Sequence, residues 1–115
     1  MSQSNPLISL EKALKCKDLS KWDFYEAVTG HDWHNEPLLR FGEIHPFKFT
    51  SKNRDQIYEL VKKLRRYYEQ TYEPEDNVRQ YYCSQCDRID KAYQTGKVRK
   101  QKAAIEGLLS AIVLD

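Results

Sequence analysis

Apolar side chains recur at intervals of three and four residues along most of this chain. The clearest run comprises Ile57, Leu60, Val61, Leu64, Tyr68 and Thr71. This spacing places all of its members on one face of a helix. Ser51 or Asn53 is expected to cap the helix start, and Pro74 limits the helix at about Glu73, because the residue before a proline avoids helical geometry.

Two further helices are predicted in the second half of the chain. The first follows the negative charge of residues 75–77, and Gly96 is its expected C-cap. Its apolar side carries Val78, Tyr82, Gln85, Ile89 and Tyr93. The second runs from about Val98 to Leu114, and its stripe is Ile105, Leu108, Leu109 and Ile112. A short link makes the helices before and after Pro74 antiparallel neighbours.

Two shorter helices are predicted near the N-terminus. Asn5 and Pro6 suit the cap and first position of one helix, in which Leu7, Leu10 and Leu14 share a face. Ser20 and Asp23 form a capping-box pattern at the start of the next helix. Trp22, Tyr25 and Val28 mark its apolar side, and Gly30 is expected to stop it.

Residues 31–50 carry no helical period and are punctuated by two prolines and a glycine. This segment is rich in aromatic residues, so we expect it to wrap over the helices and complete the core. Ile44, Phe47 and Phe49 are candidates for a short extended piece. The predicted fold is all-α: residues 1–115 form a single helical domain, a compact bundle of four to five helices with an irregular aromatic-rich segment at 31–50.

Composition narrows the class of protein further. The chain has a net charge of +2, three cysteines and 14 aromatic residues (eight Tyr, four Phe and two Trp). It contains no run of about 20 apolar residues, so no membrane partner is expected. Its first residues lack the pattern of a signal peptide, and an odd cysteine count does not suggest a disulfide framework. A cytoplasmic location is therefore expected.

One candidate for chemistry is a tetrahedral metal site of the Cys2His2 type. The ligands would be the H-x-x-H pair His31 and His34 and the C-x-x-C pair Cys83 and Cys86. Both cysteines fall inside a strong helical pattern rather than a zinc knuckle, which favours two free thiols. A redox role for this pair lacks the preceding strand that such motifs require.

Catalytic signatures are scarce. The chain has only four glycines and no Gly-rich phosphate loop of either common type. Its cysteines and histidines have no nucleophile elbow or oxyanion-hole motif beside them. We therefore expect a non-enzymatic protein without a cofactor.

Basic residues are concentrated in two segments and suggest nucleic-acid binding as an alternative function. The candidate phosphate contacts are Arg65, Arg66, Lys97, Arg99, Lys100 and Lys102. Tyr67 and Tyr68 follow the first segment and offer faces for base stacking. A mixed, solvated helix face equally explains the first segment. The second segment is harder to explain in that way because it contains no acidic residue.

The preferred function is a regulatory or adaptor role through protein binding. Five tyrosines fall near one end of the predicted helical hairpin, namely Tyr67, Tyr68, Tyr72, Tyr81 and Tyr82. Adjacent helical residues point about 100° apart, so at least one of each adjacent pair should be partly exposed. The C-terminal helix is apolar on several sides, which adds a homodimer through that helix as a second expected mode of association.

Overall fold

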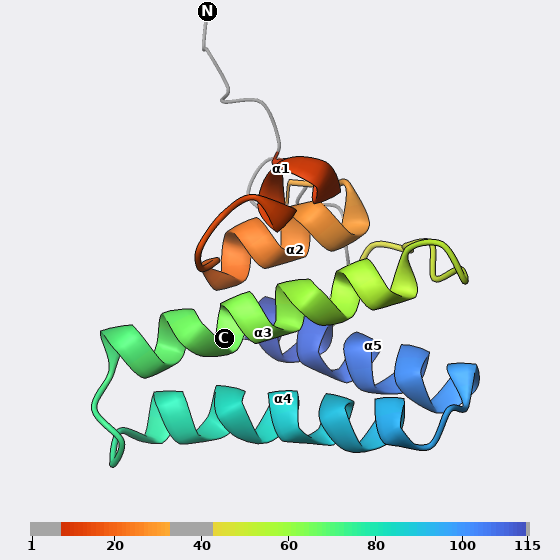
Figure 1. Cartoon of the computed structure of the whole chain (residues 1–115). Helices are drawn as coiled ribbons and strands as arrows, with labels where there is room; N and C mark the ends of the chain where they lie inside the picture. Colours follow the sequence, from red (N-terminus) through yellow and green to blue (C-terminus); the bar gives the residue numbers. More distant parts are fainter. Residues whose placement is uncertain (1–7, 33–42, 115) are drawn as a thin grey trace, which may run out of the picture.

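The structure is a computed structural model, and it describes residues 8–32 and 43–114. Within these ranges every regular element is an α-helix, which confirms the all-α class. The helices are α1 (Leu10–Leu14), α2 (Lys21–Thr29), α3 (Arg54–Thr71), α4 (Asn77–Gln94) and α5 (Val98–Leu114). In Figure 1 the antiparallel hairpin of α3 and α4 lies in the plane of the view, with α1 and α2 above α3 and α5 behind the hairpin.

The first helix begins later than the sequence predicted. Its cap is Ser9, whose hydroxyl oxygen accepts a hydrogen bond from the Lys12 backbone N–H at 3.0 Å. The predicted start at Asn5 is therefore wrong for this helix. Asn5 and Pro6 themselves lie outside the described residues. A serine in extended geometry satisfies an orphan N–H of the first turn, and this local bond fixes where the helix begins.

The boundaries of α2 agree with its sequence signals. Ser20 Oγ accepts from the Asp23 N–H at 3.3 Å, and Gly30 closes the helix in the left-handed region with a φ of 75°. Glycine suits that conformation because it has no Cβ to clash. The helix buries a wider face than the predicted stripe, because Phe24 and Ala27 are buried together with Tyr25 and Val28.

At the start of α3, Asn53 occupies the cap position but uses its side chain differently. Its Oδ1 accepts from the Thr50 N–H at 2.8 Å, and its Nδ2 donates to the Lys48 carbonyl at 2.9 Å. The amide therefore holds the preceding turn rather than the helix start. At the other end, Tyr72 is already extended, so α3 stops at Thr71, short of the predicted limit at Glu73.

The core is one buried cluster to which all five helices contribute. The predicted face of α3 is buried from Ile57 to Tyr68, whereas Thr71 is exposed. On α4, Tyr82 and Ile89 are buried as predicted. Val78 is 40% exposed, and Cys86 is fully buried. The cysteine thus serves α4 as a small core residue.

The apolar C-terminal helix is covered within the monomer. Its buried residues include Ile105, Leu108, Leu109, Ala111, Ile112 and Val113, and α5 packs against α2 and α4. Most of the apolar surface on which a homodimer through α5 was expected is therefore buried against α2 and α4. Leu114 is 50% exposed at its end. No helix in the described ranges is both long and apolar enough to span a bilayer.

The described part of the irregular segment, residues 43–50, packs on the helices as expected. Ile44, Phe47 and Phe49 lie against the core without forming a strand. Buried His45 is fixed by Tyr25, whose hydroxyl accepts from the His45 backbone N–H at 3.0 Å and lies 2.8 Å from its Nδ1. Residues 33–42 of the predicted segment lie outside the described residues.

Buried Gln101 provides a test of the packing of α5. Its side chain is 4% exposed, and its Oε1 has no hydrogen-bond partner among the described residues. A buried polar atom without a partner costs about 1–3 kcal/mol. We expect Gln101→Met to raise the free energy of unfolding by about 1 kcal/mol in urea denaturation. Exposed Gln94→Met is the control, and an equal gain there would contradict this explanation.

Candidate functional site

The five tyrosines singled out in the sequence come together where α3 turns into α4. Tyr68 and Tyr82 stack with ring centroids 4.4 Å apart and planes 6° from parallel. Tyr72 lies over Tyr68 at 5.7 Å, while Tyr67 and Tyr81 meet their neighbours edge to face. The predicted clustering is confirmed. We call this group the tyrosine end of the hairpin.

The members of the tyrosine end differ in burial. Tyr68 and Tyr82 are 2% exposed and belong to the core, whereas Tyr67 and Tyr72 are half-buried. Tyr81 is 50% exposed. Each adjacent pair therefore divides into one core residue and one accessible residue, as the 100° helical rotation requires. Val78 lies three residues before Tyr81 on α4, so these two accessible side chains are neighbours.

Negative charge surrounds the tyrosine end. Glu69, Glu73 and Glu75 are exposed, and Asp76 caps α4 by accepting from the Val78 N–H at 2.8 Å. Two cations lie close in sequence, Arg66 and Arg79, and Arg79 lies in the first turn of α4. Its guanidinium donates to the carbonyl oxygens of Glu69 and Tyr72, at 3.2 and 3.1 Å, so it is held against the turn. This acidic rim was not predicted from the sequence, although the acidic residues before Asn77 were its signal.

Two of the predicted nucleic-acid contacts have structural roles. Arg65 donates from α3 to two carboxylates of α4, Asp87 at 2.8 Å and Asp90 at 2.7 Å. Arg66 donates to the Lys17 carbonyl at 2.9 Å and so holds the segment that precedes α2. Their predicted role as phosphate contacts is therefore not supported.

The other predicted basic contacts lie far from Tyr67 and Tyr68. Lys97, Arg99, Lys100 and Lys102 are exposed around the start of α5. Figure 1 places this turn at the opposite end of α4 from the tyrosine end. The 18 residues of α4 span about 27 Å at 1.5 Å per residue. The structure therefore does not place this basic segment next to Tyr67 and Tyr68.

The candidate metal ligands do not assemble in the described part of the chain. No three His, Cys, Asp or Glu side chains in these ranges are placed to hold a metal ion, so His31, Cys83 and Cys86 do not form such a group. His31 instead stacks on His45 with centroids 4.3 Å apart. His34 lies outside the described residues.

The two helical cysteines lie in environments that disfavour the thiolate. Burial raises the pKa of Cys86 to about 12, and its Sγ faces the Val61 carbonyl at 3.9 Å. Burial is also the main cause of the raised pKa of Cys83. Nucleophilic and metal-binding cysteines need the thiolate form, so neither residue is prepared for such chemistry.

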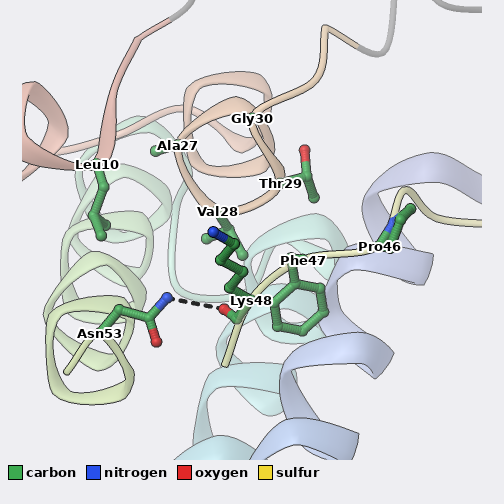
Figure 2. Close-up of a pocket in the computed structure, with 9 residues that line it drawn as sticks. All are labelled: Leu10, Ala27, Val28, Thr29, Gly30, Pro46, Phe47, Lys48 and Asn53. Carbon is green, nitrogen blue, oxygen red and sulfur yellow. Dashed lines mark hydrogen bonds between the residues drawn. The ribbon is translucent and has the colours of Figure 1, made fainter. Parts of the chain in front are cut away.

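A cavity of about 500 Å³, which sequence reasoning missed, lies beside α2. Figure 2 shows Ala27, Val28 and Thr29 on one side of it and Pro46, Phe47 and Lys48 crossing another. The hydrogen bond from Asn53 to the Lys48 carbonyl lies at its edge. The lining contains no acidic, histidine or cysteine side chain among the described residues, so it offers no acid–base pair.

Comparison with known proteins found no matching family model, no similar curated protein and no similar solved structure.

Proposed function

We propose that this chain is a non-enzymatic adaptor or regulatory protein that binds another protein through its tyrosine end. The observation that carries the proposal is the half-exposed ring of Tyr81 beside Val78. This ring contacts buried Tyr82 edge to face, and Tyr82 stacks on Tyr68. Tyrosine is enriched at interfaces because it combines a large contact area with few rotatable bonds. The edge-to-face contact with buried Tyr82 restricts the orientation of the Tyr81 ring before binding. This restriction lowers the entropy cost of association.

The acidic rim indicates the chemistry of the partner. Glu69, Glu73 and Glu75 are exposed around the aromatic patch, and Arg79 is engaged with backbone carbonyls. Charge complementarity therefore favours a protein surface that presents Lys or Arg beside aliphatic side chains. A cationic group can also pack over the Tyr81 ring, an interaction worth about 0.5–1 kcal/mol at exposed sites.

Nucleic-acid binding through the residues first considered is less well supported. Arg65 and Arg66 are engaged with α4 carboxylates and the Lys17 carbonyl, and the tyrosines stand within an acidic rim. Phosphates would be repelled by that rim. A cytoplasmic site of action is part of the proposal, because Cys16, Cys83 and Cys86 are all free thiols.

Selection from a phage-displayed random peptide library, with the full chain as bait, tests the proposed partner chemistry. We expect enriched peptides to carry Lys or Arg beside aliphatic residues. We expect Tyr81→Ala to weaken the binding of a selected peptide by about 30-fold, the effect of removing an interface hot spot.

Val98→Ala is the matched control, because Val98 is 41% exposed and is the first residue of α5. Figure 1 shows α5 beginning at the end of α4 opposite the tyrosine end. Equal binding to the wild-type chain and to Tyr81→Ala would overturn the proposal. Enrichment of acidic peptides would overturn the assigned partner chemistry.

A further inference from the structure

A second candidate binding site lies between the last turns of α4 and the first turns of α5. It is a hollow of about 360 Å³, within the size range of small-molecule sites. Its lining residues are Arg88, Lys91, Ala92, Thr95, Lys100, Ala103 and Ala104. We call it the basic hollow. Among these residues only Lys100 was a candidate from the sequence, because Arg88 and Lys91 come from a different helix.

Three cations from two helices line the basic hollow. Arg88 and Lys91 belong to α4 and Lys100 to α5, and the lining contains no acidic residue. All three are exposed, and in the described part of the chain none of them forms an ion pair. Like charges that face one hollow without a counter-charge repel one another, so the arrangement favours an anion between them.

The first turn of α5 adds to the positive potential of the hollow, whereas the last turn of α4 brings the negative end of its own dipole there. The Gln101 N–H donates to the Lys97 carbonyl at 3.1 Å, which places Lys97 at the cap position of α5. A lysine side chain has only donors and cannot accept from the N–H groups of the first turn. The positive end of the helix dipole therefore lies beside Lys100, where cations are disfavoured and an anion is stabilised.

The remaining polar group of the lining is already satisfied. Thr95 Oγ1 donates to the Ala92 carbonyl at 2.6 Å and accepts from the Lys97 N–H at 3.1 Å. The charged side chains are thus the strong donors that remain for a ligand. Ala92, Ala103 and Ala104 contribute only methyl groups, so the space between the two helices stays open.

We propose that the basic hollow binds an oligophosphate group, as carried by inorganic pyrophosphate or by a nucleoside triphosphate. The guanidinium of Arg88 presents paired N–H donors that match two phosphate oxygens, and the lysines act as point charges. Three cations suit the multiple negative charges of two linked phosphates. The lining contains no aromatic residue for base stacking, which favours a compact phosphate group over single-stranded nucleic acid.

Isothermal titration of the full chain with pyrophosphate at low salt tests the proposal. We expect Arg88→Ala and Lys100→Ala each to weaken binding by about ten-fold or more, the effect of losing one charge-assisted hydrogen bond. Ala103→Leu fills the hollow without changing the charge, and it should weaken binding by a similar factor. Titration with ATP identifies the source: affinity equal to that of pyrophosphate assigns the site to the phosphates alone, and ten-fold tighter binding assigns it to a nucleotide.

Arg66→Ala and Lys62→Ala are the matched controls, because they remove exposed helical cations outside the hollow. Both should bind pyrophosphate as the wild-type chain does, and thermal unfolding confirms that each variant is folded. Equal loss in the controls, or wild-type affinity in Ala103→Leu, would show that pyrophosphate responds to the overall positive charge of the surface and not to the hollow. Either result would overturn the proposal. The same conclusion follows if a single-stranded oligonucleotide binds and pyrophosphate does not displace it.

Discussion

Replacing Tyr82 by alanine is expected to lower the free energy of unfolding by about 3–5 kcal/mol, the usual cost of removing a buried aromatic ring. Tyr82 is 2% exposed and stacks on Tyr68 across the α3–α4 hairpin. Its removal leaves a cavity between two helices and exposes one face of the Tyr68 ring. Urea denaturation followed by circular dichroism measures the change.

Tyr81→Ala is the matched control, because the two residues are adjacent on α4 and Tyr81 is 50% exposed. We expect Tyr81→Ala to change the free energy of unfolding by less than about 1 kcal/mol. The pair of variants separates the tyrosine that holds the hairpin from the tyrosine assigned to binding. Similar losses in both variants would show that Tyr81 belongs to the core and would remove the basis of the proposed interface.

The helices could be predicted because their signals are local. The α3 stripe repeats over about four turns, and Ser20 and Gly30 act on backbone groups within four residues. Local competition explains the main errors. Asn5 and Ser9 both suit a cap, and the bond that Ser9 accepts from the Lys12 N–H sets the start that is observed. Asn53 binds the preceding turn because Thr50 and Lys48 offer partners there.

The tyrosine end was predictable and the basic hollow was not, for one physical reason. A tight hairpin brings residues on either side of Pro74 together whatever the rest of the fold does. Whether a charged side chain is paired depends instead on partners that are distant in sequence. Arg65 meets Asp87 and Asp90 across two helices, so its sequence neighbours gave no sign that it was engaged. Arg88 and Lys100 likewise line one hollow only because α4 and α5 pack against each other.

The same hairpin is expected to lose stability at alkaline pH. Four acidic groups along it have a raised pKa in the folded state, namely Cys83, Cys86, Tyr58 and Tyr93. Burial raises the pKa of Cys86 from 9.0 to about 12, and burial also raises the pKa of Tyr93. The pKa of Tyr58 is raised mainly by its hydrogen bond to Asp90, 2.7 Å long. The folded chain therefore keeps the protons of these groups at a pH where the unfolded chain releases them.

Cys86→Ala is accordingly expected to reduce the loss of stability at high pH. Below about pH 9 the thiol is neutral in both states, so it adds no pH dependence. Between about pH 9 and 12 only the unfolded state ionises at Cys86, and the free energy of unfolding falls by about 1.4 kcal/mol per pH unit for that group. Urea denaturation at about pH 8 and about pH 10.5, in a reducing buffer, should show a loss that is about 2 kcal/mol smaller in Cys86→Ala than in the wild-type chain. Ser84→Ala, an exposed neighbour on α4, should keep the wild-type loss. If Cys86→Ala also keeps it, the buried thiol is not a source of the alkaline instability.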